Sequence, residues 1–293
     1  QLTAQYLQNL PFAFTAAQQR VTAEISHDLA QPHPMQRLLQ GDVGSGKTVV
    51  AALAALQAVE NGWQAAVMAP TEILAEQHYQ KMRGWMEPLG LQVAWLSGAQ
   101  GKAVREAALQ AVAEGTAQVA IGTHALFQEQ VQFARLGLAV IDEQHRFGVH
   151  QRLALRMKGG QPHQLMMSAT PIPRTLAMSY YADLDVSVID QLPPGRTPVT
   201  TKLISDERRE EVFARVRDAC LQGHQAYWVC PLIEESEALQ LQTALDTYEL
   251  LTRTFPELRV GLVHGRLKPA KKQAVMQAFA AGELQLLVAT TVI

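Results

Sequence analysis

Short apolar segments alternate with longer helical segments along the first part of the sequence. The apolar segments lack a clean period of two, which is typical of strands buried on both faces of a parallel sheet. The segments between them are rich in Ala, Leu and Gln and repeat with the period of a helix. The alternation predicts strands at Arg37–Gln40, Ala65–Ala69, Val93–Leu96, Val119–Gly122, Leu138–Ile141 and Leu165–Met167. It predicts helices at Thr48–Glu60, Ile73–Trp85, Gly101–Ala113, Gln151–Leu155 and Arg174–Tyr181.

The pattern breaks at residues 193–198 and then starts again. Three prolines and one glycine in these six residues cannot continue a helix or a central strand, so a linker is favoured over a surface loop. We therefore expect an α/β domain at 1–192, a linker at 193–198 and a second α/β domain at 199–293 that is incomplete at its C-terminal end. In the second domain the sequence predicts strands at Val199–Leu203, Gln225–Cys230, Val260–Val263 and Gln285–Ala289, and helices at Asp206–Leu221, Glu237–Thr254 and Pro269–Ala280.

Composition narrows the class of protein. The chain has 293 residues, 48% of them apolar and 18% charged, which suits two domains with buried cores and excludes disordered, collagen-like and coiled-coil chains. The net charge of −2 excludes a strongly basic nucleic-acid clamp but leaves room for a local basic stripe. No segment reaches the roughly 20 apolar residues that a membrane span needs. Cys220 and Cys230 are too few for a disulfide framework, so we expect two small buried side chains in a reducing compartment.

A glycine-rich segment between the first predicted strand and the next helix carries the first candidate chemistry. Residues 41–48, Gly-Asp-Val-Gly-Ser-Gly-Lys-Thr, fit the pattern G-x-x-x-x-G-K-[ST] at every fixed position, and we call them the phosphate loop. Its glycines let the backbone wrap around phosphates beside a helix N-terminus. Lys47 is expected to neutralise the β- and γ-phosphates, and Thr48 to offer its hydroxyl to Mg²⁺. The expected nucleotide-binding residues of the loop are Gly41, Gly44, Ser45, Gly46, Lys47 and Thr48.

Two adjacent carboxylates follow the strand predicted at Leu138–Ile141. A carboxylate at the C-terminal end of a parallel strand, next to a phosphate loop, suits a Mg²⁺ ligand. We expect Asp142 to hold Mg²⁺ through water and Glu143 to orient and deprotonate the attacking water as a general base. The pair indicates hydrolysis of the nucleotide as well as binding. A metal hydrolase is set aside, because the histidines show no zinc spacing such as H-E-x-x-H.

With these two segments, the sequence resembles the superfamily 2 helicases and translocases. Residues 142–145, Asp-Glu-Gln-His, resemble that family's hydrolysis motif, so the resemblance implies catalytic roles for Asp142, Glu143 and His145 alongside Lys47, and a coupling role for Gln144. Residues 14–18 resemble its Q motif, in which Gln18 would read the adenine edge, although a helix cap at Thr15 explains that segment equally well. Residues 168–171 resemble motif III, which implies that Ser168 and Thr170 couple hydrolysis to domain movement, with simple capping as the alternative.

Further segments resemble the nucleic-acid motifs of the same superfamily. Residues 69–77 resemble motif Ia and residues 121–124 motif Ib, where the threonines could instead cap helices. Residues 227–232 resemble motif IV, residues 263–266 the DNA-contact motif that follows it, and residues 287–293 the start of motif V. For Arg266 the alternative is a solvated surface. The resemblance implies DNA contacts at Pro70, Thr71, Thr123, His124, His264, Arg266 and Thr290.

Within the superfamily, residues 142–152, 193–200 and 234–237 resemble the RecG family of double-stranded DNA translocases, which remodel stalled replication forks and branched junctions. The transcription-repair coupling translocases share the strings at 146–149 and 171–176. The resemblance implies two RecA-like lobes, each a parallel sheet flanked by helices, with the second lobe truncated. It also places the wedge domain and the arginine finger of motif VI outside residues 1–293. An arginine finger can supply roughly 10³–10⁵ in rate, so we expect this piece of a longer protein to be nearly inactive alone.

The resemblance therefore predicts an ATP-dependent double-stranded DNA translocase or helicase that acts on stalled forks and Holliday junctions in recombination and repair. ATP and Mg²⁺ are the expected cofactors. Branched or duplex DNA is the expected partner, with single-strand-binding protein as a further candidate and no membrane partner. We expect a monomer in the bacterial cytoplasm, associated with the nucleoid. A transcription-repair coupling translocase, a small-molecule kinase and a truncated non-catalytic nucleotide-binding module are the alternatives; a second α/β domain after a proline-rich linker argues against a kinase.

Overall fold

The computed structural model divides the chain into two compact units, Gln1–Thr197 and Pro198–Ile293. It describes residues 1–98, 100–128, 130–142, 161–170, 184–192, 195, 199–230 and 237–290, without the side chains of Phe127, Pro269 and residues 237–240. The helices predicted at Gln151–Leu155 and Arg174–Tyr181, and most of the segment 193–198, lie outside these residues. No helix in the described ranges is long and apolar enough to cross a membrane.

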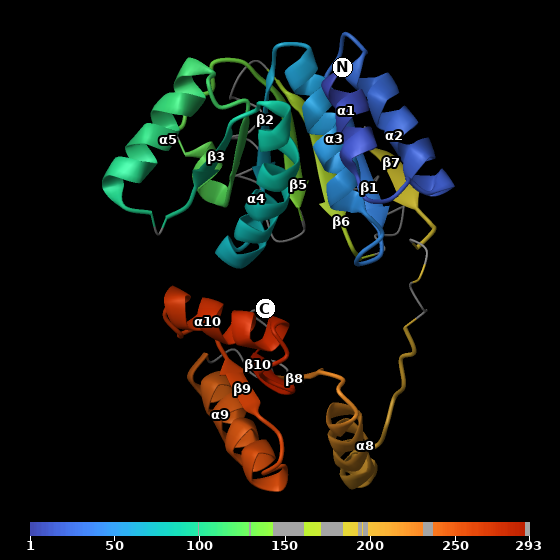
Figure 1. Ribbon diagram of the computed structural model, residues 1–293, viewed down its shortest axis with the longest axis vertical. Helices are drawn as coiled ribbons and strands as arrows, with labels where there is room; N and C mark the ends of the chain where they lie inside the picture. The colour runs from blue at the N-terminus through green and yellow to red at the C-terminus, as the bar shows by residue number, and fades with distance from the viewer. Residues whose placement is uncertain are drawn as a thin grey trace. The chain divides into compact units, whose positions relative to one another are not determined.

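The first unit is a parallel sheet flanked by helices (Figure 1). Its strands are β1 (Gln36–Gly41), β2 (Gln64–Met68), β3 (Val93–Leu96), β4 (Val119–Gly122), β5 (Leu136–Asp142), β6 (His163–Ser168) and β7 (Asp185–Ile189). Its α-helices are α1 (Leu2–Asn9), α2 (Ala16–Leu29), α3 (Lys47–Glu60), α4 (Glu72–Met86) and α5 (Lys102–Glu114), with 3₁₀ turns η1 (Glu87–Leu89) and η2 (His124–Phe127). The seven strands lie in the order β3-β4-β2-β5-β6-β1-β7, and every neighbouring pair is parallel. The expected α/β fold is therefore confirmed.

The strands of this sheet are buried on both faces. Leu39 and Val140 belong to the core beneath α1, α2, α3 and α4, whereas Leu38 and Ala139 belong to the core on the opposite face, with Val112 of α5. Because consecutive strand residues face opposite sides of a sheet, apolar residues are needed at every position. This explains why the strands appear in the sequence as apolar runs without a period of two.

Helix α3 connects the phosphate loop to this core. Every residue from Val49 to Leu56 is buried, and most of them are alanine or valine. The small side chains let the helix lie between the sheet and the helices α1 and α2, which both contact it. The part of α3 that follows the phosphate loop is therefore packed against both the sheet and the neighbouring helices.

The second unit contains a smaller parallel sheet. Its strands β8 (Ala226–Cys230), β9 (Val260–Val263) and β10 (Leu286–Thr290) lie in the order β8-β10-β9. Its helices are α8 (Arg209–Leu221), α9 (Glu237–Thr254) and α10 (Pro269–Ala280), preceded by the turn η4 (Asp206–Arg208). Cys220 and Cys230 are free and buried in this unit, as expected. Burial raises the pKa of the Cys220 thiol.

The strand predicted at Val199–Leu203 is wrong. The structure assigns no strand to these residues, and Val199 and Leu203 are 89% and 103% exposed. A strand is stable only when its backbone groups pair with a neighbour, and the β8-β10-β9 sheet does not include this segment. The continued alternation of predicted strands and helices after the linker is therefore insufficient to identify a strand here.

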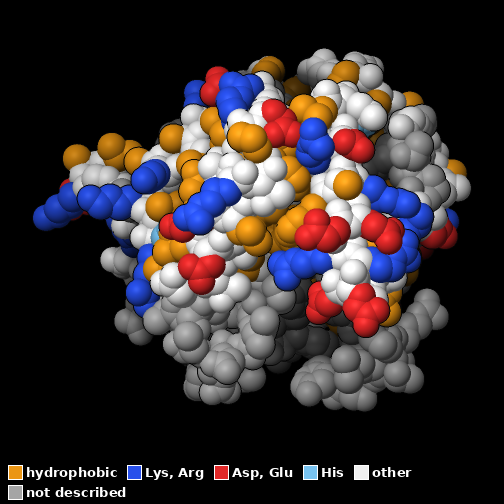
Figure 2. Space-filling model, turned by 90° about the horizontal axis from the view of Figure 1, so that it is seen from below, with side chains coloured by type: hydrophobic (Ala, Val, Ile, Leu, Met, Phe, Trp, Pro, Cys, Tyr) orange, Lys and Arg blue, Asp and Glu red, His pale blue; other side chains and the backbone are white. Residues whose placement is uncertain are grey.

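The surface carries charges of both signs. On the face drawn in Figure 2, Lys and Arg side chains are interspersed with Asp and Glu and with apolar side chains. This distribution agrees with the net charge of −2, which comes from 25 basic and 27 acidic residues. Any attraction for a polyanion must therefore come from local clusters of basic residues.

Candidate nucleotide-binding site

Three neighbouring strands carry the candidate site at their carboxyl ends. The phosphate loop follows β1, Asp142 ends β5 and Ser168 ends β6. Strand β6 lies between β1 and β5. In the register of the sheet, Gln40 of β1 is opposite Ser168, and Asp142 of β5 is opposite Met167. Because the strands are parallel, their carboxyl ends meet at one edge of the sheet, where α/β proteins place their ligands.

The phosphate loop forms a tight turn at the start of α3. Gly46 is the N-cap of α3 with φ 94°, a left-handed conformation that favours glycine. A Cβ atom added at Gly41 would come within 2.5 Å of Ser45 Oγ, so the close approach of these two residues requires glycine. Ser45 is fully buried, and its hydroxyl has no hydrogen-bond partner. A buried hydroxyl of this kind suits a loop whose polar groups are completed by a ligand.

The Lys47 side chain folds back over the loop. Its Nζ donates to the carbonyl oxygens of Gly41 at 2.6 Å and Asp42 at 3.0 Å. These bonds hold the ammonium group against the backbone of the loop. A phosphate that enters would compete with the two carbonyl oxygens for the ammonium protons.

Gln18 connects α2 to the phosphate loop. Its backbone N–H donates to Thr15 Oγ1, and its Oε1 accepts from the Thr15 N–H, so the two residues form a capping box. Its Nε2 donates to the carbonyl oxygen of Ser45 at 2.8 Å. The capping explanation of this segment is therefore correct for Thr15, while Gln18 also supports the loop. Its expected contact with adenine stays a prediction.

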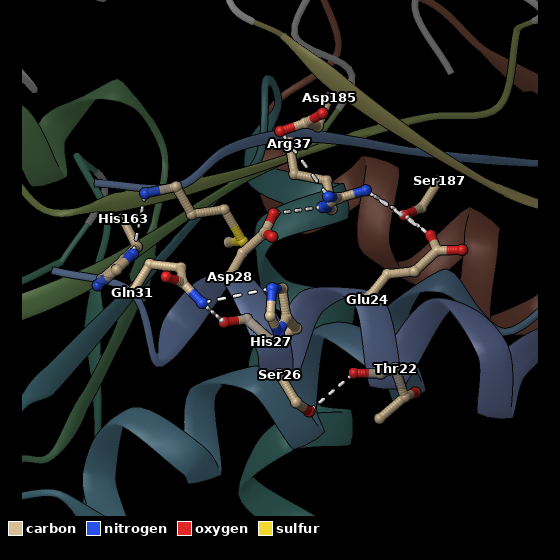
Figure 3. A network of polar contacts seen from close by, with 11 residues as sticks. Thr22, Glu24, Ser26, His27, Asp28, Gln31, Arg37, His163, Asp185 and Ser187 are labelled. Carbon is tan, nitrogen blue, oxygen red and sulfur yellow. Dashed lines mark hydrogen bonds and ion pairs between the residues drawn. The ribbon is translucent and has the colours of Figure 1, made fainter. Parts of the chain in front are cut away.

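A buried arginine fixes α2 against the sheet (Figure 3). Arg37 Nε donates to Asp28 Oδ2 at 2.7 Å, and Nη1 donates to Ser187 Oγ at 2.9 Å. Glu24 lies 3.6 Å from the same Nη1, and Asp185 lies 3.8 Å from Nη2. Arg37 is on β1, Glu24 and Asp28 are on α2, and Asp185 is on β7. The Arg37 side chain is only 11% exposed. The network therefore joins α2 and β7 to the strand that leads into the phosphate loop.

Asp142 has a neighbour that the sequence reasoning missed. His78 Nε2 lies 2.6 Å from Asp142 Oδ2, and the two side chains are 9% and 13% exposed. His78 is on the buried stripe of α4 together with Ala75, Met82 and Met86. A histidine on an otherwise apolar stripe, directly after the segment that resembles motif Ia, is the signal that could have found it.

Ser168 and Thr170 bond to each other at the end of β6. Ser168 Oγ lies 3.0 Å from Thr170 Oγ1 and accepts from the Thr170 N–H at 3.2 Å. Ser168 is buried and Thr170 is exposed. These bonds order the turn beside the phosphate loop, and the expected coupling role of both residues stays a prediction.

The candidate DNA contacts of the first unit are close together. Met68 and Gly122 pair across β2 and β4, so the segments after these strands are neighbours. Pro70, Thr123 and His124 line a shallow cavity of about 190 Å³ with Glu72 and Arg105 among its other lining residues.

The two threonines of these segments differ. The Thr71 hydroxyl accepts from the Leu74 N–H at 3.3 Å and caps α4, which is the alternative that the sequence left open. Thr123 is buried and its side chain makes no capping bond to η2. A DNA contact at either residue stays a prediction.

In the second unit, His264 directly follows β9 and Thr290 is the last residue of β10. Val263 pairs with Ala289 across β9 and β10, so the two residues lie at the same end of the sheet. Thr290 is buried and Arg266 is exposed. Burial lowers the pKa of His264, and the positive charges of Lys272, Arg266 and Lys271 lower it further. We call Arg266, Lys268, Lys271 and Lys272 the basic cluster of this unit.

The described residues fit a magnesium-bound nucleoside triphosphate. Thr48 opens α3 beside the glycine cradle, and Asp142 offers a carboxylate at the same sheet edge, so both donors are the hard oxygens that Mg²⁺ prefers. Glu143, Gln144 and His145, the other expected residues of this motif, lie outside the described residues.

Comparison with known proteins identifies the family of the chain. The DEAD/DEAH box helicase family matches residues 15–179, and the helicase conserved C-terminal domain family matches residues 207–293. The ATP-dependent DNA helicase RecG of Escherichia coli is 64% identical over 289 residues, which cover 97% of this chain and 42% of the relative. RecG of Pasteurella multocida is 61% identical over 298 residues, which cover 100% of this chain and 43% of the relative. The chain therefore spans less than half the length of these relatives.

Solved structures of helicases have a similar fold. A RecG structure bound to a three-way DNA junction is 45% identical with a TM-score of 0.79, and the match covers 100% of this chain and 38% of that chain. S. cerevisiae Dbp5 bound to RNA and ADP BeF3 has a TM-score of 0.72 at 16% identity over 99% of this chain and 73% of that one, which supports the fold alone. The expected resemblance to RecG is confirmed by these identities. With a family match over more than half of its length, the chain belongs to the DEAD/DEAH box helicases.

Proposed function

We propose that the protein is an ATP-driven translocase and helicase on double-stranded DNA that acts at branched structures such as stalled forks and Holliday junctions. One observation supports it most: the phosphate loop and Asp142 lie at one sheet edge in a chain that is 64% identical to a DNA helicase. In this proposal residues 1–192 and 199–293 form two RecA-like lobes, and residues 193–198 link them.

The residues of the first lobe bind and hydrolyse ATP. Lys47 exchanges the carbonyl oxygens of Gly41 and Asp42 for β- and γ-phosphate oxygens, and the N–H groups at the start of α3 donate to the remaining oxygens. Thr48 and Asp142 hold Mg²⁺, which supplies positive charge to the phosphates when it is bound. Glu143 orients and deprotonates the attacking water, with His145 as a further catalytic residue of the same motif.

The remaining candidates couple hydrolysis to DNA. Gln144, Ser168 and Thr170 transmit the change at the γ-phosphate to the second lobe, and alternate closure and opening of the lobes becomes a step along DNA. Pro70, Thr71, Thr123 and His124 in the first lobe, and His264, Arg266 and Thr290 in the second, contact the DNA backbone. Contacts of this kind position a motor on DNA without reading the base sequence.

The setting of this activity is part of the same proposal. The motor works as a monomer in the bacterial cytoplasm at the nucleoid, and single-strand-binding protein is a candidate partner there. The chain covers 42% of such a relative, so the activity is proposed for the whole protein and not for residues 1–293 alone.

Steady-state ATP hydrolysis with a branched junction, with linear duplex and without DNA tests the proposal. We expect the full-length protein to be strongly stimulated by the junction and to lose this activity in Glu143→Gln and Lys47→Ala. We expect residues 1–293 alone to stay near background. Absence of any DNA effect on the full-length protein would refute the motor. Displacement of RNA polymerase without a response to junctions would favour a transcription-repair coupling translocase instead.

A further inference from the structure

The contact between His78 and Asp142 joins two elements that are far apart in the sequence. Asp142 ends β5, whereas His78 lies about two turns into α4, and the two residues are 64 positions apart. Both side chains are largely buried, with exposures of 9% and 13%. The separation of 2.6 Å is that of a strong hydrogen bond to a charged group.

The direction of this bond follows from the chemistry of its partners. An ionised carboxylate can only accept a hydrogen bond, so the N–H at Nε2 of His78 donates to Asp142 Oδ2. The bond fixes the rotation of the Asp142 carboxylate about its last torsion, which is otherwise a broad and soft one. Oδ1 is then the carboxylate oxygen left to face a metal ion or its water.

The helix that carries His78 is itself firmly placed. Thr71 caps its start, and Met82 and Met86 of the same stripe are fully buried. A donor on such a helix has little freedom to move away from Asp142. Partners of this kind orient metal ligands, and their loss typically lowers metal affinity or activity by about 10–100-fold.

We infer that His78 is a positioning residue that orients the Asp142 carboxylate and so sets the affinity of the nucleotide site for Mg²⁺. The inference rests on the proposed function, because it takes Asp142 as the Mg²⁺ ligand. No catalytic contact is assigned to His78, which acts only through Asp142.

Mg²⁺ titration of a bound fluorescent ATP analogue tests the inference in the full-length protein. His78→Leu fills the buried position with an apolar side chain but removes the hydrogen-bond donor, and we expect the half-saturating Mg²⁺ concentration to rise about 10–100-fold. His78→Gln places an amide N–H near the position of Nε2, so its half-saturating Mg²⁺ concentration should lie well below that of His78→Leu and close to native. The same variants should change the Mg²⁺ dependence of ATP hydrolysis in the same order.

Met82→Leu is the matched control for packing. It changes a buried residue of the same stripe with little change in volume, so the Mg²⁺ requirement should stay native. If His78→Leu does not fold, His78→Asn replaces it, because its shorter amide cannot reach Oδ2.

Two negative results have different meanings. The expected rise in half-saturating Mg²⁺ concentration for folded His78→Leu, or for the Asn variant in its place, is about 10-fold or more. A value within about twofold of native would overturn the positioning role. An Asp142→Asn variant with native Mg²⁺ dependence would instead show that the proposed metal site is wrong. The two failures are therefore distinguishable in one set of titrations.

Discussion

Gly46 meets two demands at the start of α3. Its φ of 94° is in the left-handed region, and a Cβ atom there would lie 2.2 Å from Gln18 Nε2. The first demand is conformational and the second is steric, and a single substitution violates both. The glycine therefore protects both the turn of the phosphate loop and the bond from Gln18 to Ser45.

Gly46→Ala should therefore destabilise the protein by more than the roughly 1–2 kcal/mol expected for a left-handed alanine alone. It should also weaken nucleotide binding, because Gln18 has to leave the Ser45 carbonyl. Gly90→Ala separates the two effects, since Gly90 has φ 78° but no atom within 4 Å of the added Cβ. Thermal melts with and without ATP analogue check the pair, and equal losses in both variants would contradict the steric argument.

The partly buried side chain of His163 makes the stability of the protein depend on pH. Burial lowers its pKa from the ordinary value of 6.5, and the nearby His33 lowers it further, against the opposing effect of Asp28. The Met35 N–H donates to Nδ1 at 2.9 Å, a bond that requires the unprotonated nitrogen. The folded state therefore resists protonation more than the unfolded state does.

The sign of the effect follows from this difference. Above pH 6.5 His163 is neutral in both states, and its contribution to stability is fully present. As the pH falls below 6.5, the unfolded state takes up the proton first, so stability is lost through the folded pKa. His163→Asn keeps an acceptor for Met35 and should flatten this part of the curve. Urea unfolding between about pH 7 and 5 measures it, and equal slopes in both proteins would rule the effect out.

At the residue scale, the sequence predicted the members of the phosphate loop but not all of its neighbours. A fixed spacing of Gly, Lys and Thr after a strand identifies the loop, since backbone geometry demands those residue types there. The His78 contact escaped prediction because it joins α4 to β5 across the fold. No local spacing encodes a contact of that kind.

At the scale of elements, the Arg37 network holds α2 on the sheet. Removing the guanidinium leaves Asp28 and Glu24 without their main positive neighbour, at sites that are 17% and 37% exposed. Arg37→Met keeps the aliphatic stem and should cost about 3–5 kcal/mol, the usual result of breaking a buried ion pair. We expect a lower nucleotide affinity too, since α2 carries Gln18.

Arg20→Met is the matched control for this prediction. Arg20 also joins α2 to the region of β7 through Asp190, but the two side chains are 49% and 59% exposed. Exposed pairs contribute little because water screens them. Chemical denaturation of both variants should show a much larger change for Arg37. Similar changes in the two proteins would mean that the network does not depend on burial.

Most strands of the first unit were predictable because they are apolar on both faces. Other segments show the limits of that pattern. Strand β7 escaped prediction because it pairs only with β1, at the edge of the sheet, and its burial alternates. Helix α1 was not predicted, and α2 was raised only as the capping alternative at Thr15, which is the residue that caps it. Val199–Leu203 was predicted as a strand but lacks a neighbouring strand.

At the scale of the whole molecule, the net charge of −2 opposes binding to DNA. Affinity for DNA must then depend on local groups of positive charge such as the basic cluster. Each phosphate neutralised by a basic residue changes the slope of log K against log salt by about 0.9 for duplex DNA. Arg266→Gln should therefore weaken binding and make that slope less steep by about one.

Arg253→Gln is the matched control in the same unit. Arg253 is exposed on α9 and paired with Glu249, and it lies outside the basic cluster. Fluorescence anisotropy with duplex DNA at several salt concentrations gives both slopes in the full-length protein. An unchanged slope for Arg266→Gln would remove this residue from the DNA contacts.

The position of β1 in its sheet has a consequence for synthesis of the protein. Both strands that pair with β1, namely β6 and β7, are made long after it. Met35, just before β1, and His163, the first residue of β6, are 128 residues apart. At about 5–20 residues per second, a ribosome needs roughly 6–26 s to make the intervening chain. The strand that leads into the phosphate loop therefore emerges with its edges uncovered, and nascent chains of this protein should depend on chaperones until β6 and β7 arrive.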